Sequence, residues 1–357
     1  MKNRILAINP GSTSTKIAIF DGEEEKFVKT IKHSAEELAR FDTIADQYEF
    51  RKHVVLEELE KNNMDIRDLD VVIGRGGLVK PIESGVYKVN DLMLKHLMEG
   101  FSGEHASNLG GLIADSISRE AGIGFALIAD PVVVDELDAL ARISGHPDFE
   151  RISIFHALNQ KAIARTYAKQ INRKYEDLNL IVAHMGGGIS VGSHKQGRVV
   201  EVNQALDGDG PFSPERSGTL PMNKVVKACF SGNYTYEEMK RIIVGKGGYV
   251  AYFGSNDAIA VEKAASEGDE KALLVENAMA YQVAKEIGAS AAVLKGKVDA
   301  ILLTGGLAYG KPFVERIKKY ISWIAPIEVY PGEDEMRALA LNALRILRGE
   351  EEAKDYQ

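Results

Sequence analysis

The chain has 357 residues, 45% hydrophobic and 27% charged, so its composition is that of a folded globular protein and not of a disordered or fibrous one. Its length leaves room for about two domains. With 44 basic and 52 acidic side chains its net charge is −8, which argues against a nucleic acid or an anionic membrane as the main partner. The single cysteine, Cys229, excludes a disulfide framework and a multi-cysteine zinc site, and it favours the cytoplasm.

The first predicted element is a β-hairpin. Apolar strands at residues 5–8 and 17–20 flank a turn rich in glycine, serine and threonine, and the second strand ends at Asp21–Gly22. Asn, Pro and Gly interrupt the first apolar stretch before it reaches signal-peptide length, so we expect no export signal. No apolar run approaches the roughly 18 residues that a membrane-spanning helix needs. We therefore expect no membrane segment.

Helices and strands then alternate along the first half. Apolar spacing predicts them, in chain order, at residues 47–62 (helix), 70–73 (strand), 106–120 (helix) and 125–128 (strand). The turn Gly145–Asp148 predicts a domain boundary near residues 147–154. We therefore expect a first domain at residues 1–150 and a second at 151–332.

The second half repeats the order of the first. A strand, a glycine turn and a second strand recur from residue 180 onward. Asn9 and His184, which open the two turns, are 175 positions apart, and so are Gly22 and Gly197, which close the two hairpins. Two copies of one supersecondary unit explain the match, although glycine-rich hairpins also coincide by chance.

Further elements follow the second hairpin. We predict helices near 157–175, 237–244, 258–266 and 270–294, a strand at 299–303 and a last helix at 334–347. The alternation predicts an α/β protein with mixed sheets flanked by helices and with ligands at the strand ends between the domains. The last helix could pack on either domain, and we expect residues 333–348 to join the first. The charged tail, residues 349–357, is expected to be a frayed, solvated end.

Three glycine-rich loops directly follow apolar strands, at residues 9–15, 184–190 and 304–307. Backbone N–H groups without a neighbouring Cβ can approach phosphate oxygens closely, so three such loops indicate a polyphosphate ligand. Each loop taken alone could equally be a tight turn or a packing glycine. None has the spacing of a P-loop or of a dinucleotide fingerprint, which disfavours those two nucleotide folds.

Loop cations and carboxylates could serve phosphoryl transfer, which needs positive charge around the phosphoryl oxygens and carboxylates for a metal. Arg75 lies among glycines, whose small size would leave its guanidinium room to bind a planar anion, and Arg216 lies in a loop rich in Gly and Pro. Asp130 follows a strand and could be an ordinary turn aspartate. Both arginines could equally be surface residues.

The eight histidines show no metal-ligand spacing, so a zinc site is not expected. His184 opens the second glycine turn where Asn9 opens the first. His156 ends an apolar run and could be a buried structural residue. Glu335 could simply be an acidic residue at a helix N-terminus.

Taken together, the segments Asn9–Lys16 and His184–Ser190 and the loops of Arg75 and Arg216 resemble the acetokinase family. The resemblance runs from Asn3 to Arg348. It implies duplicated ribonuclease-H-like domains, the actin-like ATPase fold shared with sugar kinases and Hsp70. It also implies ATP- and magnesium-dependent, reversible phosphorylation of a short-chain fatty acid carboxylate (butanoate or a branched relative) to an acyl phosphate, by a homo-oligomer, dimer or larger.

The resemblance also implies residue roles. Arg75 and Arg216 match the arginines that grip the substrate carboxylate and the transferring phosphoryl group, and His156 matches a histidine that stabilises the transition state. The phosphate and nucleotide contacts fall on Asn9, Ser12, Ser14, Lys16, His184, Gly186, Gly187, Gly188, Gly305 and Gly306. The metal positions fall on Asn9, Asp130 and Glu335, with Glu333 and Asp334 as neighbouring alternatives to Glu335. Asp130 is also a catalytic candidate.

The chain departs from the acetate-using pattern of the family. Phe155–Asn159 stands where acetate kinases carry His-Gly-Thr-Ser-His, and Gly187 stands where they carry Asn. Both departures favour the butyrate-using branch. His105 resembles a substrate-side histidine, although a role at a helix start is equally open.

Because a carboxylate is already an anion, in-line transfer from ATP requires no general base. Two other functions stay open. A hydroxyl-directed kinase on the same fold would use Asp130 as its base. An actin- or Hsp70-like nucleotide switch would use the same loops to drive partner binding, but no peptide-binding domain is recognisable.

Overall fold

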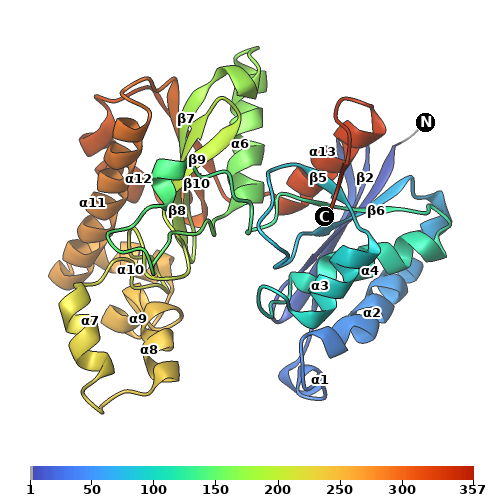
Figure 1. Cartoon of the computed structure of the whole chain (residues 1–357), viewed down its shortest axis with the longest axis horizontal. Coiled ribbons are helices and arrows are strands. Elements are labelled where there is room, and N and C mark those ends of the chain that lie inside the picture. Colours follow the sequence, from blue (N-terminus) through green and yellow to red (C-terminus); the bar gives the residue numbers. More distant parts are fainter. Residues whose placement is uncertain (1–2) are drawn as a thin grey trace. The chain divides into compact units, whose positions relative to one another are not determined.

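The structure is a computed structural model that describes residues 3–357 and divides into two compact units (Figure 1). The first unit contains the chain up to Val134 together with residues 334–357, and the second contains residues 135–333. The last helix therefore belongs to the first unit, and residues 135–150 belong to the second. Within the described part of the chain, none of the helices is long and apolar enough to cross a membrane.

The first unit is built on a mixed sheet in the order β12-β5-β6-β4-β1-β2-β3. Strand β1 runs antiparallel to β2 and parallel to β4. The strands are β1 (Arg4–Pro10), β2 (Ser14–Asp21), β3 (Glu24–Lys32), β4 (Val71–Arg75), β5 (Val86–Lys88), β6 (Ala126–Ala129) and β12 (Lys354–Asp355). The middle residues of the central strands, 5–8, 71–73 and 126–129, are apolar and buried, as expected for a sheet covered by helices.

Helices α4 and α13 provide the main packing on this sheet. Helix α4 packs on β4 and β6 and is joined by α2, and α13 packs on β1 and β4. The helices are α1 (Ala35–Leu38), α2 (Tyr48–Lys61), α3 (Asp91–Glu99), α4 (Asn108–Glu120) and α13 (Glu335–Leu347), with short 3₁₀ turns at 45–47 and 66–68.

The second unit repeats the core of this topology. Its sheet has the order β11-β10-β7-β8-β9, in which β7 is antiparallel to β8 and parallel to β10. This matches β6-β4-β1-β2-β3, so the predicted α/β fold with duplicated mixed sheets is confirmed. The strands are β7 (Asn179–Met185), β8 (Ile189–Lys195), β9 (Arg198–Val202), β10 (Ala300–Gly305) and β11 (Ile327–Pro331).

Helix α11 forms the core of the second unit with β7 and β8, where Met279, Val283 and Ile287 are fully buried. Helix α6 packs on β7 and β10. It ends at Gln170 and not near 175 as predicted, because Asn172 turns to positive φ. The helices are α5 (Ala139–Arg142), α6 (Ala157–Gln170), α7 (Met222–Cys229), α8 (Tyr236–Ile243), α9 (Gly248–Phe253), α10 (Ala258–Ser266), α11 (Glu270–Val293) and α12 (Lys311–Ile321), with 3₁₀ turns at 175–177 and 306–309.

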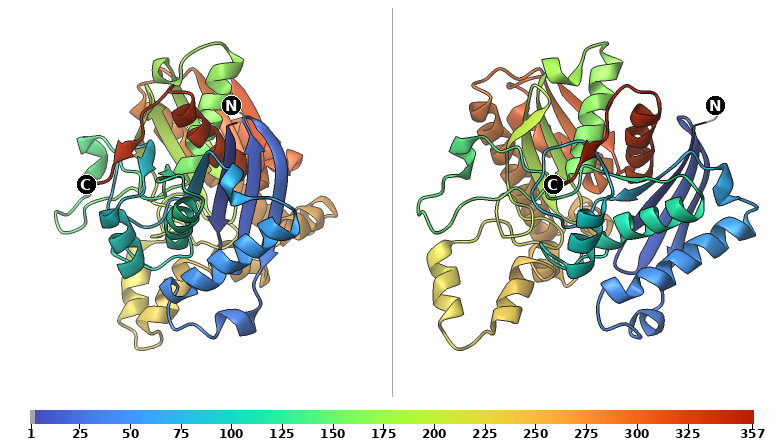
Figure 2. Two further views of the ribbon diagram at one scale, coloured as in Figure 1. Left: turned by 90° about the vertical axis from the view of Figure 1, so that its right-hand side faces the viewer. Right: turned by 45° about the vertical axis from the view of Figure 1, so that its right-hand side comes forward.

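The expectation of a frayed tail is wrong. Strand β12 pairs in parallel with β5, and Tyr356 is 3% exposed. Figure 2 shows the red end of the chain turning back to lie beside the cyan strand of the same unit. The charges of the tail are solvated, but its tyrosine packs as a core residue, and composition alone hid this.

Candidate active site

The first glycine turn joins β1 to β2 and presents four of the predicted phosphate residues on one hairpin. Asn9 is half-buried near the end of β1, Ser12 is exposed at the tip, and Ser14 and Lys16 are half-buried on β2. The turn closes through a hydrogen bond in which Gly11 N–H donates to the Ser14 carbonyl at 2.7 Å.

Arg51 of α2, which the sequence reasoning missed, holds this turn from the protein interior. Its guanidinium is 1% exposed and donates to the carbonyls of Gly11 (2.6 Å) and Ser12 (3.1 Å) and to Gln47 Oε1 (2.8 Å). Burial lowers the pKa of Arg51 to about 10. The sequence does contain a sign of this role. Arg51 lies four and eight positions before the buried Val55 and Leu59 of α2, so it places a charge on the apolar face of the helix.

Three predicted residues from three separate elements meet beside this turn. Asn9 Nδ2 donates to Glu335 Oε2 at 2.5 Å, and Arg75 Nη1 donates to the same carboxylate at 3.2 Å. Arg75 Nη1 also lies 3.4 Å from Asn9 Oδ1. About a quarter of the Arg75 side chain and a fifth of the Glu335 side chain are exposed, so both are open to a ligand.

The glycines around Arg75 allow the backbone of α4 to pack closely against this loop. The predicted role of these glycines was instead to leave room for the Arg75 guanidinium. A Cβ on Gly74 would lie 2.1 Å from the Gly110 carbonyl oxygen of α4, and a Cβ on Gly77 would lie 2.6 Å from the Cα of Asn108. The close approach brings the start of α4 against the Arg75 loop, where Leu78 N–H donates to Asn108 Oδ1.

His105 and Asp130 occupy loops of the same unit. Burial and the charge of Arg75 lower the pKa of His105, which places the imidazole in the field of that guanidinium. The His105 ring also accepts from Ser107 N–H at 3.2 Å, so the helix-start role is present as well. Asp130 has a φ of 38°, and its Oδ1 accepts from Ser84 Oγ (2.6 Å) and Gly85 N–H (2.9 Å).

The three adjacent acidic residues at the start of α13 contact different partners. Glu335 contacts Asn9 and Arg75 in the first unit. Asp334 caps α13 by accepting from Arg337 N–H. Glu333 lies in the second unit, 3.2 Å from His184 Nε2. In residues 3–357, no three His, Cys, Asp or Glu side chains cluster as ligands of a metal ion.

The second glycine turn joins β7 to β8 and is tighter than the first. Gly186 N–H donates to the Gly188 carbonyl at 2.9 Å. His184 is buried at the end of β7, with Nδ1 2.8 Å from Asn159 Oδ1. The His156 ring stacks on it at 3.9 Å between centroids and 14° between planes. The predicted pair of histidines therefore meets at this turn.

The first turn of α6 aligns these rings through a buried polar network that the sequence did not reveal. His156 Nδ1 lies 2.8 Å from Ser190 Oγ, and Gln160 Nε2 donates to the same hydroxyl at 2.8 Å. Gln160 Oε1 lies 2.9 Å from Nε2 of the fully buried His194. Burial, with Lys161 nearby, lowers the pKa of His194 well below its ordinary value.

Arg216 covers the second turn. A Cβ on Gly188 would lie only 1.9 Å from Arg216 Nη1, so a larger residue there would displace the guanidinium. Arg216 Nη1 donates to the Ala205 carbonyl at 2.8 Å, and Ser213 Oγ donates to the Gly187 carbonyl at 2.5 Å. Burial lowers the pKa of Arg216, and its buried Nε has no hydrogen-bond partner among the described residues. An unpartnered buried donor on a cation suits an anionic ligand.

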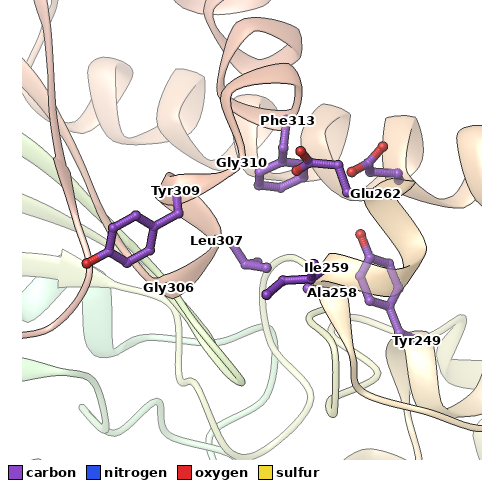
Figure 3. A pocket seen from close by; sticks show the side chains of 10 residues that line it. Tyr249, Ala258, Ile259, Glu262, Gly306, Leu307, Tyr309, Gly310 and Phe313 are labelled. Carbon is purple, nitrogen blue, oxygen red and sulfur yellow. The ribbon is translucent and has the colours of Figure 1, made fainter. Parts of the chain in front are cut away.

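The third glycine loop packs directly on the second turn. Gly305 has a φ of 90°, and a Cβ there would lie 2.3 Å from the Met185 carbonyl oxygen. Gly306 begins a 3₁₀ turn that lines a cavity of about 260 Å³. Figure 3 shows Leu307 and Ile259 facing each other across it.

The polar wall of this cavity includes Tyr249, Glu262 and Glu276. Arg316 lies behind the wall, 2.7 Å from the carboxylate of Glu276. Burial raises the pKa of Glu276, an effect that Arg316 opposes and Glu262 adds to. Burial, with Glu276 nearby, raises the pKa of Tyr249. The cavity is mostly apolar with few polar groups, which is the usual chemistry of a small-molecule site.

Comparison with known proteins gives the following similarities. The acetokinase family matches residues 151–320. "Butyrate kinase 2" of Clostridium acetobutylicum is 58% identical over 357 residues, which is 100% of both chains. Two crystal structures share the fold at low identity. Acetate kinase of Porphyromonas gingivalis has a TM-score of 0.78 at 18% identity, covering 97% of this chain and 100% of its own. A propionate kinase of Francisella tularensis has a TM-score of 0.74 at 16% identity, covering 95% and 98%.

Proposed function

We infer the reaction from one premise: the chain belongs to the acetokinase family. It is an ATP-dependent phosphotransferase whose acceptor is the carboxylate of a short-chain fatty acid, butanoate or a branched relative, and whose product is an acyl phosphate. The observation that carries this is the 58% identity, over both full lengths, to a protein named butyrate kinase. The reaction is reversible because an acyl phosphate can return its phosphoryl group to ADP.

In the proposed step a carboxylate oxygen attacks the γ-phosphorus of ATP in line. The new bond joins that oxygen to phosphorus, the bond to the β-phosphate oxygen breaks, and ADP leaves with the electron pair. No proton has to be removed from the acceptor, so the site needs no general base. Arg75 orients the carboxylate through its planar guanidinium, with His105 beside it.

Residues of the second unit stabilise the charge that develops on the phosphoryl group. Arg216 supplies a fixed cation whose Nε is unpartnered, and the glycine turn 186–188 supplies backbone N–H groups. The rings of His156 and His184, stacked and anchored by α6, add their nitrogens to this site. Asn9, Ser12, Ser14 and Lys16 present polar groups to phosphate from the first hairpin.

The donor chemistry near Glu335 fits Mg²⁺, which prefers oxygen ligands and takes one or two protein carboxylates together with substrate phosphates. Glu335, Asn9 and Asp130 offer only oxygen ligands, and Glu335 is partly open to solvent. When bound, Mg²⁺ would neutralise charge on the phosphates. The absence of a three-acid cluster in the described residues is compatible with this kind of site.

The cavity beside Gly306 is the proposed nucleoside site. Its volume of about 260 Å³ and its apolar walls at Ile259 and Leu307 suit a purine. Gly305 holds this loop against the second glycine turn, so a nucleoside here would direct its phosphates toward Gly186–Gly188.

We further propose a homo-oligomer acting in the cytoplasm. Helix α7 buries none of its residues, and Met222, Val226 and the adjoining Phe230 are 73%, 45% and 88% exposed. Apolar faces of this kind mark association surfaces. Light scattering of the wild type and of Phe230→Asp checks this, with a smaller mass expected for the variant.

Hydroxylamine trapping tests the reaction, because an acyl phosphate yields a hydroxamate and a sugar phosphate does not. Incubation with ATP and a series of straight and branched acids should give hydroxamate in amounts equal to ADP. Phosphorylation of a hydroxyl compound would favour the hydroxyl kinase. Slow ATP hydrolysis that no carboxylic acid accelerates would favour the nucleotide switch.

A further inference from the structure

The last four residues, 354–357, form a segment that we call the strap. Strand β12 pairs with β5, and Tyr356 is buried with both its hydroxyl and its carbonyl in hydrogen bonds. Its hydroxyl accepts from Lys80 N–H at 3.0 Å and lies 2.8 Å from His96 Nδ1, and its carbonyl accepts from Asn90 Nδ2 at 2.7 Å. These contacts fix the end of the chain against the first unit, whereas a solvated charged tail would make none of them.

We propose that the strap positions three residues of the proposed acceptor site: Arg75 and His105, which contact the carboxylate, and Asp130, a candidate metal ligand. The proposal rests on the function proposed above for those residues. The strap touches neither substrate nor reacting atoms, so Tyr356 and Lys354 are positioning residues.

The first link runs from Tyr356 to Arg75. The loop from Gly76 to Lys80 follows Arg75 directly, and its far end is fixed by the hydrogen bond from Lys80 N–H to the Tyr356 hydroxyl. Gly77 fixes its middle by packing against Asn108. A loop of this length held at both ends has few alternative paths, so the strap limits where Arg75 can lie.

The second link runs from Tyr356 to His105. Tyr356 orients the His96 ring at the end of α3, and Phe101 stacks on that ring with 4.5 Å between centroids. Lys80 Nζ lies 5.9 Å from the Phe101 centroid and ties the two loops together. Phe101 begins the segment that ends at His105.

The third link runs from Lys354 to Asp130. Lys354 Nζ donates to the Ser84 carbonyl at 2.8 Å and pairs with Glu83 at 3.3 Å. Ser84 Oγ and Gly85 N–H are the groups that donate to Asp130 Oδ1. One short strand therefore braces all three segments that carry the proposed acceptor site.

The strap is itself anchored to the helix that carries Glu335. Arg345, in the last turn of α13, pairs with Glu351 at 2.9 Å and fixes the turn that leads into β12. Glu335, at the start of α13, contacts Arg75, and Tyr356, beyond the end of α13, contacts Lys80 of the loop that follows Arg75.

Tyr356→Phe is the sharpest test, because it keeps the buried ring and removes only the hydroxyl. We expect the KM for the carboxylate to rise about tenfold, the equivalent of one lost hydrogen bond. The KM for ATP should stay within about twofold, because the hydrogen bonds of Tyr356 reach none of the residues proposed to bind ATP. Tyr236→Phe is the matched control, since that tyrosine is 74% exposed on α8, and it should change neither KM.

Lys354→Met provides a second variant that probes the link to Asp130 without touching the core. It should raise the carboxylate KM by a smaller factor, about threefold, since its ion pair with Glu83 is partly exposed. A lower melting temperature with an unchanged carboxylate KM would show that the strap is structural only, and a parallel rise in both KM values would also overturn the proposal. If the wild type itself shows no carboxylate-dependent turnover, the proposed function fails instead.

Discussion

The two glycine hairpins have the same strand pairing but are supported from different sides. In the first, Arg51 lies inside the fold and binds the carbonyls of Gly11 and Ser12, leaving the tip exposed. In the second, Arg216 lies over the turn, with its guanidinium against Gly188. In the first hairpin the arginine is enclosed and stabilises the fold. In the second hairpin the arginine faces the turn, where we propose that a ligand binds.

The difference indicates that the duplicated sheets kept their order while the turns took separate tasks. The first hairpin has Asn9 at the position of His184, and its side chain joins a carboxylate and Arg75. His184 instead stacks on a second histidine. Asn9 thus lies among the groups proposed for the carboxylate and the metal, and His184 lies among those proposed for phosphate.

The largest effect is expected from removing either of the two arginines proposed for catalysis. Arg216→Ala and Arg75→Ala should each lower kcat/KM by about 10³-fold or more, because positioned cations supply much of phosphoryl-transfer catalysis. Steady-state kinetics with both substrates varied, together with circular dichroism, check this. Wild-type rates in a folded variant would remove that arginine from the mechanism.

The same substitution in the two turns compares them directly. Gly188→Ala should lower kcat about 10²-fold by displacing the Arg216 guanidinium, since a shift of about 1 Å can cost that much. Gly11→Ala should stay within about twofold, because its Cβ would meet the nearest atom at an ordinary 3.5 Å. Equal losses in the two variants would contradict the distinction between the turns.

Arg51→Met should act on stability more than on catalysis. The change leaves the buried carbonyl of Gly11 and the side chain of Gln47 without their donor, which should lower the free energy of unfolding by about 2–4 kcal/mol. Urea denaturation measures this. Arg216→Ala is the comparison and should lose about 1 kcal/mol or less, since Arg216 leaves one carbonyl partner.

The smallest effect concerns pH and belongs to the second unit. Burial, with Asp209 and Glu201 nearby, raises the pKa of Glu286 from 4.5 to about 7, against the opposing charges of Arg151 and Lys285. The folded state then holds a proton that the unfolded state has lost, so stability falls as pH rises from about 4.5 to 7 and levels off above.

Glu286→Gln removes this titration. Relative to wild type, the variant should gain about 1–2 kcal/mol in unfolding free energy between pH 5 and pH 8. Urea melts across that range decide the point, with the exposed Glu99→Gln as control. A difference between wild type and Glu286→Gln that stays constant with pH would contradict the raised pKa.

Local patterns predicted the two hairpins, the 175-residue offset between them and the long helices. The spacing of apolar residues and the glycine turns are short-range signals that the sequence shows directly. The acetokinase resemblance identified Arg75, Asn9 and Glu335, and the structure brings them together. The resemblance could not separate Glu333 from Glu335. Only the packing of α13 shows that the two carboxylates face different partners.

The parts that escaped prediction depend on long-range contacts. Gln160 and Asn159 look like ordinary polar residues at a helix start. Their role comes from hydrogen bonds to Ser190 and His184, which are 30 and 25 residues away along the chain. The glycines beside Arg75 suggested open space, but the start of α4 fills it. Tyr356 lies in a charged tail, and only its pairing with β5 makes it a core residue.

The central claim is that the acceptor is a carboxylate that attacks phosphorus directly, and oxygen labelling tests it. Butanoate with both carboxyl oxygens labelled as ¹⁸O is incubated with ATP, and the product is read by ³¹P NMR. The account predicts an acyl phosphate whose phosphorus carries one ¹⁸O, in the bridge to the acyl carbon, and unlabelled ADP. An unlabelled phosphoryl product, or ADP released without any acyl phosphate, would contradict it.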